Sequence, residues 1–542
     1  MSNVLKPPCD EASIRSEAAI RPCGGEVGPW VLAATILGSS MAFIDGSVVG
    51  VILPILQSEL DATMSEVQWI VESYALLLAA LMLVGGALGD RFGRRRIFGL
   101  GVGLFAVASA GCGLAATAGQ LVAARAAQGF AGALLVPGSL AIISASFDDE
   151  RRGRAIGTWS AFTAITAAVG PVLGGWLVDN LSWRWVFYIN LPIAVVVLAM
   201  LFLRVPESRN PAHGALDWMG AALAAVGLGS LVYGLVESSN IGLSHPLVVT
   251  TVAAGAAVLG LFVLVESRVA HPMMPPSLFR SRTFSGANLV TLLLYAALSG
   301  ALFFVPFNLI QVQGYSATAA GAALLPLILI IFVLSRWAGG LIPRYGARAP
   351  LVVGPLVAAF GYVLLAVPGI GGSYWTTFFP AVAVLGVGMA ISVAPLTTAV
   401  MGSVAVEQSG IASGINNAVS RTAGLLSVAV FGVVMVAVFG RDLAARVEPF
   451  DLSIDAQASL DAERINLAAA AVPAGLDDQL RASVERAIAE SFVAGFRYTM
   501  LIAAGLAVLS ALAAVLLIEG RRSTSSIRHG ARPGAVQGDG SP

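Results

Sequence analysis

Charged residues are scarce in this sequence, at 11% of 542 residues, and histidine and cysteine are rarer still, with four and three copies. Basic and acidic residues number 31 each, so no excess of positive charge is available to attract nucleic acid. The three cysteines are scattered and offer neither a disulfide framework nor the spacing of metal ligands. Phosphate-binding loops and nucleophile motifs are also missing. We therefore expect no enzyme, metal site, cofactor or nucleic-acid partner.

Apolar residues dominate instead: 57% of the chain is hydrophobic and the mean hydropathy is +0.84. Such a composition predicts a polytopic membrane protein. The first 29 residues lack the apolar core of a cleaved signal peptide and are interpreted as a cytoplasmic tail. Runs long enough to cross a bilayer as helices follow. We predict fourteen of them, at residues 30–54, 66–88, 97–117, 121–143, 155–178, 185–203, 217–236, 247–266, 284–309, 318–338, 350–368, 374–396, 411–440 and 497–518.

Arginines concentrate in alternate loops, whereas the opposite short loops hold almost none, Arg184 being the exception. Because short cytoplasmic loops carry an excess of Lys and Arg, this asymmetry predicts a multi-pass protein of the cell membrane with both termini in the cytoplasm.

A charged link at residues 86–96 joins the second and third predicted spans and carries four arginines. Its spacing recurs at residues 339–348, where Pro343 stands in place of Asp90. The link could be a turn that only fixes topology, but its recurrence indicates two related halves. We expect tails at 1–29 and 519–542, six-helix bundles at 30–203 and 284–518, and a linker at 204–283 with two extra spans.

Ionisable groups inside the apolar runs are costly and mark candidate functional residues. Asp45, Glu72 and Arg125 fall roughly 9–14 Å below the outer surface at ~1.5 Å per residue, and Arg421 lies near the inner end of its span. The first three could share a polar pocket or proton path. The alternative is that they only reach the lipid headgroups.

Each of these residues has an expected role. Asp45 could take up and release a proton as its surroundings become wet and dry in turn, with Arg125 as its counter-charge. Glu72 could pair with Arg125 or bind a cationic substrate. For substrate we consider Asp45 and Glu72 together with three polar residues that could line a cavity or simply join helices: Gln311, Asn416 and Asn417.

Two further stretches have a structural and a functional interpretation. Gly170, Pro171, Gly174 and Gly175 remove side chains from one helix face, which permits either a packing kink or a functional bend. The loop 441–496 contains Leu480, Val484 and Ile488 at steps of four, which predicts an amphipathic helix that packs on the bundle or gates it.

Together these motifs resemble the major facilitator superfamily, and in particular its fourteen-span drug:proton antiporters, over about residues 30–520. Residues 44–54 are similar to the family's first-span exporter motif, although Ser47 and Gly50 replace the usual Thr and Asn. The run from Leu121 to Ala133 resembles its arginine motif, and Gly170 to Gly175 its antiporter motif. Trp183 to Trp185 with Asn190 to Pro192 fits the family too. The signature loop between the second and third spans is matched by Gly86, Asp90, Arg91, Gly93, Arg94 and Arg95.

The resemblance implies export of amphiphilic compounds against inward protons. It implies a cytoplasmic gate stabilised by Asp90 and Arg91, proton coupling assisted by Arg125, and a bias toward export from the Gly-Pro motif. We therefore predict an all-α bundle of two six-helix halves plus two linking spans, working as a monomeric proton-coupled exporter of small amphiphilic or cationic compounds such as antibiotics, dyes, biocides or a natural product. The alternatives are an uptake carrier for a metabolite and, less favoured, a membrane sensor without turnover.

Overall fold

The computed structural model describes the whole chain except residues 1–26, 210–216, 270–271, 273, 405–407 and 520–542, so the predicted tails lie almost entirely outside the described residues. Within the described residues, every regular element is a helix. In this part of the chain thirteen helices are long and apolar enough to cross a membrane, and a helix pair bent by 51° within residues 64–92 brings the number to fourteen if it forms one span. The predicted all-α, fourteen-span class is confirmed.

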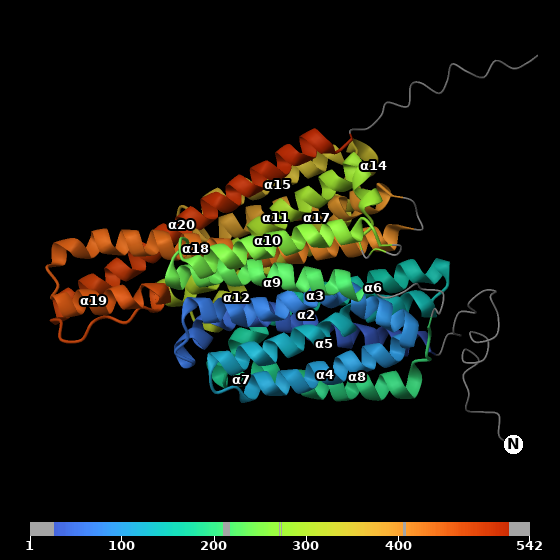
Figure 1. The fold of residues 1–542 in the computed structure, drawn as a ribbon, viewed down its shortest axis with the longest axis horizontal. Helices are drawn as coiled ribbons and strands as arrows, with labels where there is room; N and C mark the ends of the chain where they lie inside the picture. The colour runs from blue at the N-terminus through green and yellow to red at the C-terminus, as the bar shows by residue number, and fades with distance from the viewer. Residues whose placement is uncertain (1–26, 210–216, 270–271, 273, 405–407, 520–542) are drawn as a thin grey trace, which may run out of the picture.

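The N-terminal half packs around α5, against which both α3 and α4 lie, while α2 lies against α6 and α8 (Figure 1). Side-chain caps begin several of its helices: Thr63 and Glu66 form a reciprocal capping box at α3, and Asp148 caps α6. The elements are α2 (Gly28–Glu59), α3 (Met64–Phe92), α4 (Arg94–Leu114), α5 (Ala118–Ser146), α6 (Asp149–Asn180), α7 (Arg184–Tyr188) and α8 (Asn190–Arg204).

The C-terminal half repeats the design, with α15 between α17 and α20, and α11 between α18 and α20. Its elements are η1 (Pro276–Arg280), α11 (Arg282–Phe307), the π-turn η2 (Asn308–Val312), α12 (Ala317–Ala323), α13 (Leu325–Gly339), α14 (Leu341–Tyr345), α15 (Arg348–Leu365), α16 (Tyr374–Thr377), α17 (Phe379–Gly402), α18 (Ser409–Val447), η4 (Glu448–Phe450), α19 (Ile454–Ala462), η5 (Glu463–Ala469) and α20 (Asp478–Leu517).

Two helices, α9 (Trp218–Ile241) and α10 (Pro246–Glu266), pack against each other and occupy the predicted linker. Helix α9 contacts α3 of one half and α18 of the other, so the pair lies along the seam between the halves (Figure 1).

The two charged links adopt matching turns. Gly93 ends α3 with φ +112°, and Gly346 ends α14 with φ +75°. Each lies seven residues after the first glycine of its link, Gly86 or Gly339. Because L side chains rarely adopt such a φ, the turn explains why both links keep glycine at this place.

The helices that contain the last two predicted spans extend beyond those spans. Helix α18 continues to Val447 and α20 already begins at Asp478, so the predicted loop 441–496 shortens to residues 448–477. The amphipathic stretch is the first part of α20 and buries Val484 and Ile488. Both helices project beyond the rest of the bundle, with α19 at the tip (Figure 1).

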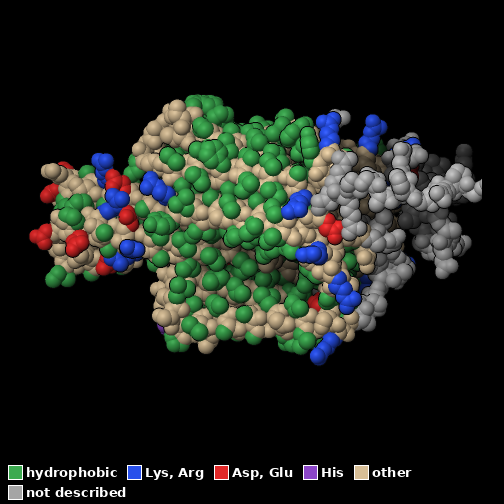
Figure 2. All heavy atoms as spheres, turned by 90° about the horizontal axis from the view of Figure 1, so that it is seen from above, with side chains coloured by type: hydrophobic (Ala, Val, Ile, Leu, Met, Phe, Trp, Pro, Cys, Tyr) green, Lys and Arg blue, Asp and Glu red, His purple; other side chains and the backbone are tan. Residues whose placement is uncertain are grey.

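Charge separates along the long axis. Figure 2 shows acidic and basic side chains together on the projecting α19 end, mainly basic side chains with some acidic ones at the opposite end, and a mainly hydrophobic face between them. We name these the α19 end and the arginine end; the links at Gly93 and Gly346 belong to the arginine end. The apolar belt is what a lipid-embedded bundle requires.

Candidate functional site

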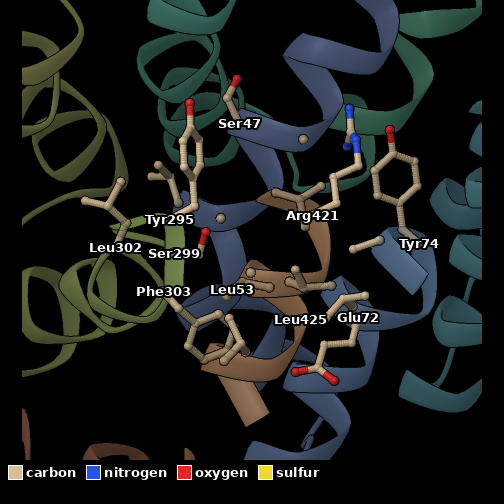
Figure 3. A pocket seen from close by; sticks show the side chains of 18 of the residues that line it. Ser47, Leu53, Glu72, Tyr74, Tyr295, Ser299, Leu302, Phe303, Arg421 and Leu425 are labelled. Atoms are coloured by element: carbon tan, nitrogen blue, oxygen red, sulfur yellow. The ribbon is translucent and has the colours of Figure 1, made fainter. Parts of the chain in front are cut away.

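A cavity of about 510 Å³ lies between the two halves. Its walls come mainly from α2 and α3 on one side and from α11 and α18 on the other (Figure 3). Glycine makes part of this space, because a Cβ added at Gly46 or Gly50 would meet nothing within 4 Å. Gly50 and Ser47, the two departures from the exporter motif, both face this cavity. The seam between the halves is therefore hollow, as a carrier needs.

Asp45 and Arg125 form an ion pair beside the cavity, with 2.5 Å between Oδ2 and NH1. Both side chains are buried, with 0% and 1% exposure. Arg125 lines the cavity, whereas Asp45 lies behind it and its neighbours Gly46 and Ser47 reach the wall. The structure thus brings together the two residues predicted to act as acid and counter-charge, and it does not bring Asp45 to the cavity surface proposed for substrate.

Gln128 completes this pair, one turn along α5 from Arg125. Its side-chain nitrogen donates to Asp45 Oδ1 at 2.9 Å, and its oxygen accepts from Arg125 at 2.6 Å. Arg125 also donates to the Ile70 carbonyl at 3.1 Å and lies 4.2 Å from the centre of the Tyr74 ring. Every oxygen of Asp45 therefore accepts a hydrogen bond, which is the arrangement of an ionised carboxylate.

A second polar layer, which sequence reasoning missed, supports Gln128. Ser109 accepts hydrogen bonds from Gln128 at 3.4 Å and from Asn190 at 2.9 Å, and Cys112 donates to the Gln128 oxygen at 3.6 Å. Three of these residues occupy α4 or α5, and Asn190 begins α8. The available signal was Asn190, a fully buried amide within a recurrent family motif.

Glu72 is separate from this network. It lies in the cavity wall with 1% exposure, and neither carboxyl oxygen has a hydrogen-bond partner among the described residues. Glu72 does not form the ion pair with Arg125 that was one of its two expected roles, because Arg125 pairs with Asp45. An unpartnered buried carboxyl is costly and is a functional candidate by default.

Of the three polar residues considered for substrate binding, one lines the cavity and two join helices. Gln311 donates to Gln57 at 3.0 Å, and Asn416 donates to Thr291 at 2.6 Å, so both join helices and neither is a cavity-lining residue. Asn417 does line the cavity.

Arg421 also enters the cavity, together with Tyr295 and Ser299 of α11. The sequence marks Arg421 as an arginine inside an apolar run but places it near the end of its span. Its position opposite Glu72 depends on how α18 faces α3, which no single helix encodes.

The arginine link contacts its own helices and the first residues of the linker. Asp90 Oδ1 lies 2.7 Å from Arg94, and Arg91 stacks on the Phe92 ring at 5.5 Å. Glu207, absent from the sequence-based candidates, accepts hydrogen bonds from the backbone N–H groups of Arg95 and Arg96 at 2.9 and 3.2 Å. It caps the start of α4, where a carboxylate also complements the helix dipole. The signal available for it was an acid between two arginines, Arg204 and Arg209, just after a predicted span.

The glycines around Pro171 serve close helix contact. A Cβ at Gly170 or Gly174 would come within 2.0 and 2.3 Å of Ser47 and Val48 of α2, and one at Gly175 within 2.3 Å of the Ala317 carbonyl of α12. The stretch therefore packs α6 against its own half and against the other half at once.

Hydrogen bonds across the seam gather toward the α19 end. Asp179 accepts from the backbone of Ala317 at 3.1 Å and from Thr318. Gln57 accepts from Gln311 and donates to the Asn466 carbonyl at 3.1 Å. Gln68 donates to the Val428 carbonyl at 3.0 Å. These contacts close the seam between the cavity and the α19 end.

No group of three or more His, Cys, Asp or Glu side chains that could hold a metal ion is found in the part of the chain that the structure describes.

Known proteins match this chain over most of its length. The model of the Major Facilitator Superfamily matches residues 35–428. Multidrug resistance protein Stp of Mycobacterium tuberculosis (strain CDC 1551 / Oshkosh) is 35% identical over 419 residues, covering 77% of each chain. The tetracenomycin C resistance and export protein of Streptomyces glaucescens is 32% identical over 513 residues, covering 92% of this chain and 94% of that protein.

The fold also matches solved structures. The crystal structure of a bacterial homolog to the human lysosomal transporter Spinster, in an inward-facing and unoccupied conformation, aligns with a TM-score of 0.63 at 18% identity. The alignment covers 91% of this chain and 98% of that one. At this identity the likeness concerns the fold alone.

Proposed function

The chain belongs to the Major Facilitator Superfamily and is a multi-pass membrane transport protein, and from this premise we propose that it is a proton-coupled exporter of small amphiphilic compounds. The relatives support this proposal because their names describe multidrug resistance and the export of tetracenomycin C. The proposed location is the cytoplasmic membrane, with the arginine end and both termini in the cytoplasm and the chain working as a monomer. The proposed units are the bundles 30–203 and 284–518, with the linker 204–283 between them.

In this orientation the structure has its outer seam closed by the Asp179 and Gln57 contacts. Substrate would enter the cavity from the cytoplasm, and rocking of the two halves would break these contacts and release it outside. The Gly170 to Gly175 face, which touches both α2 and α12, is the surface on which α6 would move during this change.

The observation that carries the proposal is the buried Asp45–Arg125 pair at the edge of the cavity. When the cavity opens outward, water and a proton can reach Asp45. A neutral Asp45 would no longer hold Arg125, which is always charged, so Arg125 would turn toward other acceptors in the cavity. Return to the inward-facing state restores the pair and releases the proton into the cytoplasm, which couples inward protons to outward substrate.

The test uses inside-out vesicles that contain the wild-type protein or Asp45→Asn, energised by a proton gradient. We expect the wild type to accumulate a fluorescent amphiphilic dye and to dissipate the gradient as it does so, and Asp45→Asn to do neither. Proton-driven accumulation by Asp45→Asn at the wild-type rate would remove Asp45 as the coupling acid. Accumulation in right-side-out vesicles under an inward proton gradient would favour uptake instead of export.

A further inference from the structure

Arg421 of α18 is a cation with no counter-ion among the described residues. Its guanidinium lines the cavity, and it makes no ion pair or hydrogen bond with any residue that the structure describes. The other cavity arginine, Arg125, is paired with Asp45 and also donates to Gln128 and to the Ile70 carbonyl. A charged group kept unpaired in the membrane interior is a functional candidate, because its burial is costly.

Further donors share this part of the cavity. The hydroxyl groups of Tyr295 and Ser299 line it, and they too make no hydrogen bond with a described residue. Figure 3 shows the Arg421 guanidinium and the hydroxyls of Tyr295 and Ser47 pointing toward the same end of the cavity. Ser47 already donates to the Ile44 carbonyl at 3.0 Å, so the donors left for a ligand at this end are the Tyr295 hydroxyl and the positively charged Arg421 guanidinium.

The rest of the cavity differs in character. Leu53, Leu302, Phe303 and Leu425 form an apolar middle section. The Glu72 carboxyl points away from Arg421, toward the opposite end (Figure 3). Since Asp45 neutralises Arg125, the net charge offered at the Arg421 end is positive. A ligand that fits has an apolar body and an acceptor-rich anionic group at one end.

We propose that this cavity selects amphiphilic organic anions, whose carboxylate, sulfonate or ionised phenol binds the Arg421 guanidinium while the apolar body lies against the leucine and phenylalanine side chains. The proposal rests on the proposed function, since it takes this cavity as the substrate site. The planar guanidinium binds such groups through paired, charge-assisted hydrogen bonds, which an ammonium cannot reproduce. An additional amine at the other end of the ligand would form an ion pair with the Glu72 carboxylate.

Two probes that share one ring system separate charge from apolar contact. Anilinonaphthalene sulfonate carries an anionic group, and N-phenylnaphthylamine lacks it. Their binding is measured by equilibrium dialysis against nanodiscs with purified protein, with empty nanodiscs subtracted to remove partition into lipid. The quantity compared between variants is the ratio of the two affinities.

In the wild type we expect the sulfonate to bind more tightly than N-phenylnaphthylamine. We expect Arg421→Gln to reduce this preference for the sulfonate by about tenfold or more, the size of one lost charge-assisted interaction. Arg421→Lys keeps the charge but not the planar fork, so its ratio should fall in between. Arg481→Gln is the matched control: it removes one positive charge from an exposed surface pair with Glu485, remote from the cavity lining, and should leave the ratio unchanged.

An unchanged ratio in Arg421→Gln, or an equal fall in Arg481→Gln, would overturn the proposal. If Arg421→Gln does not fold, an unchanged ratio in Arg421→Lys overturns it. Failure of the exporter proposal is seen separately, as a wild type that shows no proton-driven accumulation of any dye in inside-out vesicles. If the wild type exports a cationic dye and the affinity ratio is the same in the wild type and in Arg421→Gln, only the anion proposal fails.

Discussion

The Asp179 carboxylate of α6 accepts two hydrogen bonds from Thr318 of α12, from the backbone N–H at 2.8 Å and from the hydroxyl at 2.5 Å. The two residues belong to different halves of the bundle and meet at its α19 end. The first turn of α12 has backbone donors without a partner inside the helix, as every helix start does. A carboxylate from the opposite half accepts from two of them, those of Ala317 and Thr318, and Ser316 accepts from a third, that of Ala319. The contact is thus a capping interaction that works only while the seam is closed.

We expect Asp179→Ala to shift the protein toward a state that is open at the α19 end. Hydrogen bonds to a charged group are worth about 1.5–3 kcal/mol each, enough to change the population of two states. Spin labels at the exposed positions Asn180 and Ser373 would report the change as a longer distance by electron paramagnetic resonance. Glu485→Ala, which removes an acid from the same end outside the seam, should leave the distance unchanged. A distance that is identical in all three proteins would contradict the capping role.

Gly174→Ala and Gly175→Ala form a second test of the same seam. The Cβ at position 175 would press on the Ala317 carbonyl in the other half, whereas the Cβ at 174 would press on Val48 in the same half. We therefore expect Gly175→Ala to lengthen the same label distance and Gly174→Ala to lower thermal stability without lengthening it. Equal distances in the two variants would show that packing across the seam does not hold it closed.

The Asp45–Arg125 pair predicts a stability pattern that is separate from transport. Asp45→Asn leaves a buried, uncompensated Arg125, and loss of one partner of such a pair costs about 3–5 kcal/mol. The double variant Asp45→Asn/Arg125→Gln removes the orphaned charge and should recover much of the loss in thermal unfolding, while proton-driven transport stays absent. A double variant that is less stable than Asp45→Asn would argue against the buried pair.

Glu72→Gln should make the protein more stable but weaken its transport of ligands that carry an amine. The substitution keeps the side-chain shape and removes a buried carboxyl that has no partner in the described structure, so the unfolding temperature should rise. In vesicles, export of a cationic dye should fall more than export of a neutral one. Equal losses for both dyes would exclude Glu72 as a charge-recognition site.

Glu207→Ala should loosen the start of α4. The carboxylate accepts hydrogen bonds from the backbone N–H groups of Arg95 and Arg96, and loss of such a helix cap costs about 0.5–2 kcal/mol. Hydrogen exchange of these two amides should accelerate. Glu207→Gln keeps an acceptor and should show a smaller effect. No change in exchange for the alanine variant would mean that water replaces the carboxylate without cost.

Much of the architecture follows from local sequence. Apolar runs of sufficient length must form spanning helices, because lipid offers no partner for backbone groups. The glycines at positions 93 and 346 mark equivalent turns because few other residues accept a positive φ. Hydropathy does not locate the end of α18 or the start of α20, because a helix that leaves the bilayer can continue with polar residues.

The candidate site was only partly predictable. Asp45, Glu72 and Arg125 are visible in the sequence as ionisable residues within apolar runs, but the sequence does not show which of them pair. In the structure Asp45 pairs with Arg125, and the Glu72 carboxyl has no hydrogen-bond partner among the described residues. Arg421, Asp179 and Glu207 gain their significance from residues more than 100 positions away or from the opposite half.

The sequence by itself determined that this chain crosses a membrane many times, in two related halves, and which few ionisable residues it buries there. Those features depend on composition and on spacing along one helix. Only the tertiary structure decided which charges neutralise each other and which are left facing the cavity, because the relative rotation of α2, α3, α5 and α18 sets those pairings. Side chains that pack between helices fix this rotation, and the sequence of one helix alone does not show which side chains of the other helices it contacts.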